Sequence, residues 1–148
     1  MIVYFDSSSI VKWFFDEPYA DLTRSVKDET DIAFTSLLSY PEVLSAFYRA
    51  WKEGRCLKSD MELVRGEFLR IWYDFRWIKA SEMLIHNTRE LIPRHGLRGY
   101  DAVHLASALM VQEEGGGGGG INLFFSCFDR VLNRAAKKEG LLVHQSFK

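Results

Sequence analysis

The chain has 148 residues, of which 47% are hydrophobic and 26% charged, and its formal net charge at pH 7 is −1. This composition excludes a disordered chain, because enough apolar surface is present to build a core. It also argues against tight, purely electrostatic binding to nucleic acid, which requires many basic contacts to phosphates. We expect a single domain that spans residues 1–148.

Cysteine use and the absence of targeting signals predict a cytoplasmic protein. Cys56 and Cys127 provide neither a disulfide framework nor the spacing of a metal site, and a reducing cytosol is the default for such a chain. No secretory leader is recognisable, because Asp6 interrupts the first apolar run. No apolar run approaches the roughly eighteen residues of a membrane span, so we expect no membrane association.

The first half of the chain alternates short apolar runs with amphipathic segments. The apolar runs are typical of buried strands, and the amphipathic segments step by three and four residues, as packed helices do. Ser39 and Glu42 form a capping-box pattern at the start of one helix. The helices predicted at 39–52 and 59–74 are close enough in sequence to form an antiparallel hairpin. We predict strands at 2–5 and 32–35, helices at 7–15, 39–52 and 59–74, and at Pro18 either a break or a helix reaching Lys27.

The second half continues the alternation of strands and helices. Six consecutive glycines at 115–120 predict a flexible loop, because no side chain can order them. Strands that alternate with helices predict an α/β fold: a three-layer α/β/α sandwich with a central parallel sheet of four to five strands. We predict strands at 76–80, 122–126 and 141–143, and helices from Ser81 to before Pro93, at 100–112 and at 130–139.

Four acidic residues recur near the ends of predicted strands or the starts of helices. Asp6 and Asp129 follow strands, whereas Glu42 and Asp101 begin helices. A parallel sheet collects such positions along the edge where ligands bind, so we expect the four carboxylates to converge. Neighbouring carboxylates raise each other's pKa unless a cation is present. All-oxygen ligands favour Mg²⁺ or Mn²⁺, and the chemistry expected is attack of a metal-activated water on a phosphodiester.

Helix capping is the simpler interpretation of each acidic residue taken singly. Asp6, Asp101 and Asp129 are each suited to cap a helix, which stabilises it by about 1 kcal/mol. Glu42 is suited to the acidic half of a capping box. The two interpretations are compatible, because a helix N-terminus lies at the same edge of the sheet as the expected metal.

Four segments resemble one known family. They are IVYFDSSSIVKWF, TSLLSYPEVLSAFYRA, LRGYDAVHLASAL and FFSCFDRVLNRAAKKEGL, and they are spread over nearly the whole chain. Together they resemble the PIN-domain ribonucleases, and specifically the toxins of VapBC-type toxin–antitoxin modules. The chain departs from the family pattern at Cys127, where serine or threonine is frequent, and in the glycine run.

The resemblance implies a set of functional properties. Asp6, Glu42, Asp101 and Asp129 match the acidic residues of the family, which implies that they bind metal and take part in catalysis. The resemblance further implies an α/β/α sandwich, Mg²⁺-dependent cleavage of RNA, homodimerisation and inhibition by a small cognate antitoxin.

Basic and polar residues near the acidic positions are secondary candidates. Arg130 directly follows Asp129 and is a candidate for binding the scissile phosphate, although an arginine in solvent on a helix is equally ordinary. His104 lies three residues after Asp101 on the same helix face, and a packed, hydrogen-bonded histidine is the more frequent case. A basic group around the hairpin turn is more often a solvated face than an RNA-binding surface; it comprises Arg49, Lys52, Arg55 and Lys58.

Two hypotheses compete with a metal-dependent ribonuclease. One is a non-catalytic PIN-like module that binds RNA or protein, against which the four intact carboxylates argue. The other is a phosphotransfer enzyme or receiver domain. The second aspartate that a phosphoaspartate hydrolase carries two residues after the first is replaced here by Ser8.

Overall fold

A computed structural model of the chain describes residues 1–115 and 121–143. Within them, five parallel strands form one sheet in the order β3-β2-β1-β4-β5. This arrangement confirms the predicted α/β class and parallel sheet. The predicted glycine loop falls mainly on residues 116–120, outside the described residues. The strands are β1 (Ile2–Phe5), β2 (Ile32–Ser36), β3 (Arg76–Ile78), β4 (Leu123–Ser126) and β5 (Leu142–Val143).

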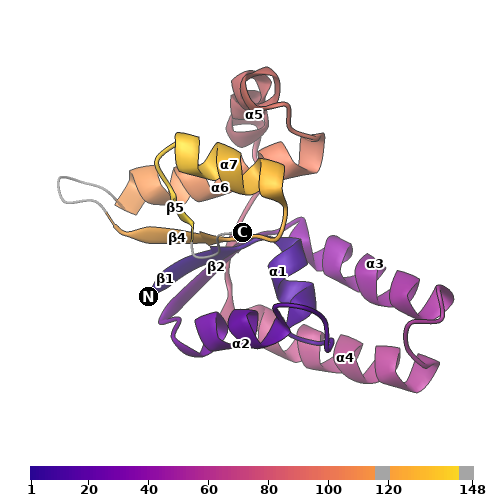
Figure 1. Cartoon of the computed structure of the whole chain (residues 1–148). Coiled ribbons are helices and arrows are strands. Elements are labelled where there is room, and N and C mark those ends of the chain that lie inside the picture. Colours follow the sequence, from indigo (N-terminus) through magenta and orange to yellow (C-terminus); the bar gives the residue numbers. More distant parts are fainter. Residues whose placement is uncertain (116–120, 144–148) are drawn as a thin grey trace.

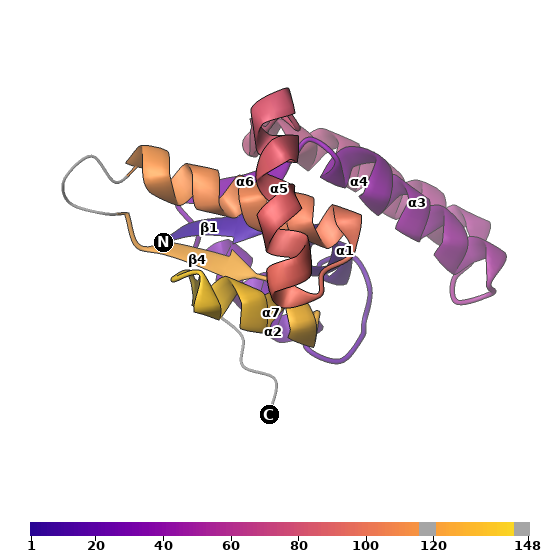
Figure 2. The same ribbon diagram turned by 90° about the horizontal axis from the view of Figure 1, so that it is seen from above.

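Helices cover both faces of the sheet (Figure 1). One face carries α5 (Glu82–His95), α6 (Gly99–Gly115) and α7 (Arg130–Lys138). The other carries α1 (Ser7–Lys12), α2 (Ala20–Asp28), α3 (Ser39–Lys52) and α4 (Lys58–Ile71), followed by the short 3-10 helix η1 (Trp72–Asp74). Helices α3 and α4 form the predicted hairpin, which extends beyond the sheet (Figure 2). Among the described residues, no helix has the length and apolarity needed to cross a bilayer.

The central strand β1 supplies side chains to both hydrophobic cores. Val3 and Phe5 are fully buried in the core beneath α1–α4. Tyr4 points to the opposite core, beneath α5–α7. Successive side chains of a strand alternate between faces, and a parallel sheet with helices on both sides therefore requires a continuous apolar run. The IVYF sequence of β1 satisfies that requirement.

The strand order places a change of direction beside β1. The chain proceeds from β1 to β2 and β3 on one side, and β4 and β5 then lie on the other. Ligands in open α/β sheets bind outside the carboxyl ends of the strands at such a switch point. Phe5 pairs with Ser126 in the register of β1 and β4, so Asp6 and the loop that contains Asp129 leave the sheet together.

Two predictions of where a helix begins or ends are wrong: the cap of α3 at Ser39 and the end of α5 before Pro93. Ser39 does not cap α3; Leu38 holds the cap position and its side chain makes no capping bond. The Ser39 hydroxyl instead lies 2.7 Å from the Thr35 hydroxyl. It therefore forms a buried polar contact and does not cap the helix. Helix α5 also continues through Pro93 to His95 and ends at Gly96, whose φ is 65°. The missing N–H of Pro93 leaves a carbonyl on the exposed side of the helix, where water can satisfy it.

Two other predicted helices are shorter than expected. Helix α1 ends at Lys12 rather than continuing to residue 15. The side chain of Arg24 donates to the carbonyls of Trp13 and Phe15, which holds these residues in a turn. The predicted helix at 59–74 changes to 3-10 geometry after Ile71. This tighter turn leads directly into β3.

A charged contact links α5 to the end of α7, outside the candidate site. The Glu139 carboxylate lies 2.6 Å from Nε2 of His95 and 2.7 Å from Nη1 of Arg94. Partial burial raises the pKa of Glu139, but hydrogen bonds from His95 and Arg94 outweigh it and lower the pKa overall. The folded state therefore favours the ionised carboxylate.

We predict that Glu139→Gln destabilises the protein by about 1–2 kcal/mol at pH 7, because His95 and Arg94 lose a charged acceptor. A carboxylate whose pKa is depressed on folding stabilises above its unfolded pKa and loses that contribution as pH falls. The difference from wild type should therefore shrink below about pH 4.3. Urea unfolding at pH 7 and in acid measures the difference in the free energy of unfolding between the variant and wild type. Equal effects of Glu139→Gln and of the exposed control Glu67→Gln would contradict this account.

Candidate active site

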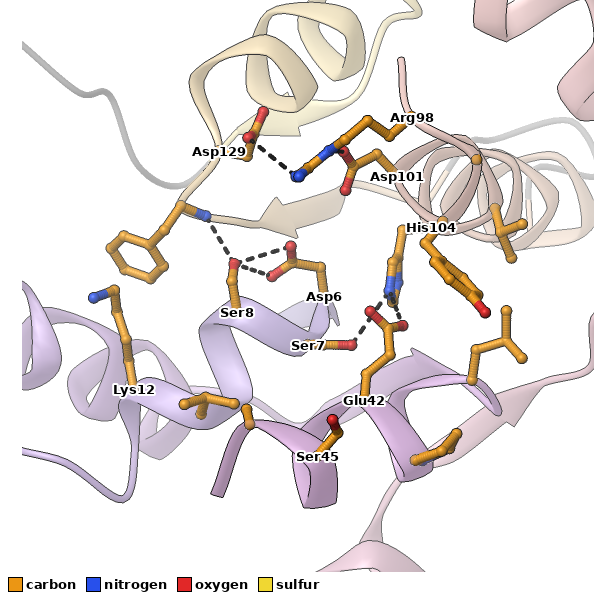
Figure 3. A pocket seen from close by; sticks show the side chains of 18 of the residues that line it. Asp6, Ser7, Ser8, Lys12, Glu42, Ser45, Arg98, Asp101, His104 and Asp129 are labelled. Atoms are coloured by element: carbon orange, nitrogen blue, oxygen red, sulfur yellow. Dashed lines mark hydrogen bonds and ion pairs between the residues drawn. The ribbon is translucent and has the colours of Figure 1, made fainter. Parts of the chain in front are cut away.

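All four predicted acidic residues line one cavity of about 1240 Å³ at the carboxyl ends of the strands. Asp6 and Glu42 reach it from the α1–α4 side of the sheet, whereas Asp101 and Asp129 reach it from α6 and the start of α7 (Figure 3). The topology thus brings together side chains that are as far apart as residues 6 and 129 in sequence. The predicted convergence on one edge of the sheet is confirmed in this sense.

Asp6 is the most buried of the four, with 5% of its surface exposed. One carboxylate oxygen accepts the N–H of Ser9 at 2.9 Å, and the Ser8 hydroxyl donates to the same carboxylate at 2.7 Å. Asp6 is therefore the N-cap of α1, as the capping interpretation predicts. Burial raises its pKa, although His104 and these hydrogen bonds partly oppose the shift. Within the described residues, Asp6 forms no ion pair, so its charge is poorly compensated.

Ser8 joins the end of β1 to the loop after β4. Its hydroxyl donates to Asp6 and accepts the backbone N–H of Phe128 at 3.2 Å. The Asp6 backbone N–H also donates to the carbonyl of Ser126. These contacts fix the Asp6 carboxylate relative to the loop that carries Asp129.

Glu42 belongs to a hydrogen-bonded chain that reaches into the core. Its Oε1 lies 2.9 Å from Nε2 of His104, and Nδ1 of His104 lies 2.9 Å from the Tyr4 hydroxyl. Burial lowers the pKa of His104, but the hydrogen bond to Glu42 and the charges of Asp6, Glu42 and Asp101 raise it overall. The capping-box prediction for Glu42 is therefore wrong, because the long-range partner His104 takes the carboxylate.

Asp101 and Asp129 share a cation supplied by the chain itself. Nε of Arg98 lies 3.0 Å from Oδ2 of Asp101, and Nη2 of Arg98 lies 3.9 Å from Oδ2 of Asp129 (Figure 3). The hydrogen bond and charge of Asp101, together with the charge of Asp129, raise the pKa of Arg98. Asp129 is also the N-cap of α7, since its Oδ1 accepts the N–H of Leu132 at 2.8 Å.

The four carboxylates line one cavity but do not share one set of partners. Among residues 1–115 and 121–143, no three His, Cys, Asp or Glu side chains are placed to hold a metal ion together. The reason is visible in the contacts above: His104 engages Glu42, and Arg98 lies between Asp101 and Asp129. The imidazole of His104 and the guanidinium of Arg98 thus lie beside carboxylates that would otherwise repel one another.

Basic side chains line the same cavity. Lys12, Arg49 and Arg98 are among its lining residues, whereas Arg130 is exposed and is not among the described residues that line it. The phosphate-binding role of Arg130 remains a prediction. Arg49 comes from the basic group expected at the hairpin, and α3 places it on the same side as Glu42, seven residues earlier.

Three contributors were not predicted from the sequence. Tyr4, Ser8 and Arg98 hold the acidic residues, yet Tyr4 reads as core and Ser8 as a turn residue. Arg98 alone carries a local signal, because it precedes Asp101 by three residues, a spacing at which opposite charges can pair. Cys127 is fully buried, and burial raises the pKa of its thiol, so it has no nucleophilic character.

The family model described as PIN domain matches residues 3–138. The chain belongs to the PIN-domain family. Ribonuclease VapC45 of Mycobacterium tuberculosis (strain CDC 1551 / Oshkosh) is 32% identical over 142 residues, which cover 96% of this chain and 94% of that protein. The resemblance to VapC-type PIN domains is therefore confirmed.

Solved structures share the PIN-domain fold at low sequence identity. The crystal structure of Mycobacterium tuberculosis VapC20, a sarcin-ricin loop cleaving toxin, superposes with a TM-score of 0.64 at 17% identity, over 90% of this chain and 94% of that chain. A toxin-antitoxin complex from Klebsiella pneumoniae contains a chain with a TM-score of 0.59 at 16% identity, over 86% of each chain. At these identities the likeness establishes the fold.

Loss of the Tyr4 hydroxyl tests the series of hydrogen bonds that runs from Tyr4 through His104 to Glu42. We predict that Tyr4→Phe destabilises the protein by about 1–2 kcal/mol, because the buried Nδ1 of His104 loses its partner. The exposed Tyr48→Phe serves as the matched control and should change stability by less than about 0.5 kcal/mol. Urea unfolding of both variants measures the difference. Equal stabilities for the two variants would contradict a structural role for this hydrogen bond.

Proposed function

We propose that the protein is a metal-dependent endoribonuclease that hydrolyses RNA phosphodiester bonds, and that it acts as the toxin of a toxin–antitoxin pair. The observation that carries this proposal is the arrangement of Asp6, Glu42, Asp101 and Asp129 around one cavity in a VapC-type PIN domain. The relative that is 32% identical is named a ribonuclease. We place the protein in the cytoplasm, which agrees with its two free cysteines.

The residues of the cavity fit a divalent cation of the Mg²⁺ or Mn²⁺ type. Carboxylate oxygens are the ligands that these hard cations prefer. The buried, poorly compensated charge of Asp6 and its raised pKa are what a cation at this position would offset. Asp6, Glu42, Asp101 and Asp129 are the residues that would hold it. When bound, such an ion lowers the pKa of water and polarises a phosphoryl oxygen.

The other residues of the cavity bind and orient. Lys12, Arg49 and Arg98 provide positive charge at the rim, where RNA phosphates would lie. His104 fixes the direction of the Glu42 carboxylate, and Ser8 fixes that of Asp6. Glu42 is thereby suited to orient the attacking water. These roles account for the mixture of acidic and basic side chains in one cavity.

A cognate antitoxin and a second copy of the chain are the proposed protein partners. The antitoxin is supported by the structural likeness to a chain from a toxin-antitoxin complex. The homodimer rests on the family resemblance. Light scattering coupled to size-exclusion chromatography should give about twice the 17.1 kDa mass of the chain; a monomeric mass at micromolar concentration would contradict the dimer.

Cleavage of RNA with and without metal tests the proposed function. We predict that Asp6→Asn lowers the rate of cleavage by at least about a hundredfold, because even supporting residues around a metal change its affinity by 10–100-fold. The exposed control Asp28→Asn should keep the wild-type rate. Chelation with EDTA should abolish cleavage and added Mg²⁺ should restore it. Cleavage that persists in EDTA, or in Asp6→Asn, would overturn the proposal.

A non-catalytic PIN-like module that binds RNA or protein is the alternative. No contact among the described residues favours it over the enzyme. Retained RNA binding with no cleavage under any metal would establish it.

A further inference from the structure

Arg98 is held at the site by two carboxylates rather than by packing. Its side chain is 81% exposed, yet its guanidinium lies 3.0 Å from Asp101 and 3.9 Å from Asp129. Both partners are acidic residues that line the cavity. An exposed arginine loses side-chain entropy when it adopts one position, so the attraction of the two carboxylates is what keeps it there.

The position that the Arg98 guanidinium occupies is also one where a divalent cation would be favoured. Asp101 comes from the first turn of α6, and Asp129 is the N-cap of α7. The two carboxylates face the cavity from the same side of the sheet, and the guanidinium reaches between them (Figure 3). Arg98 thus offsets a repulsion that a divalent cation would offset more strongly, because the ion is compact and doubly charged.

We propose that Arg98 is a resident counter-cation that competes with the divalent metal for Asp101 and Asp129. This inference rests on the proposed metal site but adds a property that belongs to the chain itself. In the metal-free protein, Arg98 holds the two carboxylates in place and prevents their mutual repulsion. Metal binding displaces the guanidinium from them, so the affinity for metal is lower than the carboxylates alone would provide.

Binding of Mn²⁺ to the full chain, measured by calorimetry at low ionic strength, tests the competition. Arg98→Gln should bind Mn²⁺ about two- to fivefold more tightly than wild type, which is the range expected from an exposed ion pair. Arg98→Lys, which keeps the charge, should lie closer to wild type. The matched control is Arg49→Gln, which removes the same charge from another wall of the cavity. Arg49→Gln should bind Mn²⁺ with less than half of the gain in affinity seen in Arg98→Gln.

Thermal unfolding supplies a second measurement that does not depend on catalysis. In EDTA, Arg98→Gln should melt at a lower temperature than wild type, because Asp101 and Asp129 lose their shared cation. At saturating Mn²⁺ the gap should close. A gap that is unchanged by Mn²⁺ would show that Arg98 is only a structural residue, and would overturn the inference.

The outcomes separate this inference from the proposed function. If wild type and all variants fail to bind Mn²⁺, the proposed function fails and the inference fails with it. If wild type binds Mn²⁺ but Arg98→Gln binds no more tightly, or no more tightly than Arg49→Gln, only the competition is overturned.

Discussion

Repulsion among carboxylates at one edge of the sheet is the constraint on which the site depends. The topology brings four acidic side chains to one cavity, where like charges repel one another unless nearby groups offset them. The chain itself supplies two nitrogen-bearing side chains as partners for these carboxylates. His104 pairs with Glu42, and Arg98 reaches Asp101 and Asp129. Asp6, at the centre of the sheet, forms hydrogen bonds but no ion pair among the described residues. Asp6 is therefore the buried carboxylate of the cavity for which a bound cation would be most favourable.

The central strand connects the core to this chemistry. Tyr4 is fully buried, stacks on Phe125 and places its hydroxyl against His104. Asp6, two residues after Tyr4, directly follows β1 and caps α1. A single run of six residues thus supplies both the hydrophobic centre of the sheet and the deepest acidic residue of the cavity. Because these roles share one strand, packing of Tyr4 and Phe5 fixes where the Asp6 carboxylate lies.

The sequence predicted the fold and the convergence of the four acidic residues on one edge of the sheet, because both follow from short-range patterns. The roles of these residues in metal binding and catalysis stay predictions. Apolar runs and helical spacing located the strands, and parallel topology then required Asp6 and Asp129 to meet. The sequence was less informative about which residue each polar side chain contacts. The Ser39–Glu42 capping box does not form, because Ser39 contacts the buried hydroxyl of Thr35 and Glu42 contacts His104, which is distant in sequence. The roles of Tyr4 and Ser8 could not be predicted, because a tyrosine in an apolar strand and a serine in a turn occur equally often where they contact no functional residue. Asp6 and Asp129 are both N-caps, as the capping interpretation predicted, whereas metal binding by them stays a prediction.

We propose that these four carboxylates together form one divalent-metal site. Anomalous diffraction from a crystal of the wild-type protein soaked in Mn²⁺ tests it most directly. We expect a manganese peak inside the cavity, within coordination distance of Asp6 and of at least one carboxylate from the opposite wall, Asp101 or Asp129. Manganese bound only elsewhere on the protein, or a cavity without any peak at saturating Mn²⁺, would contradict it.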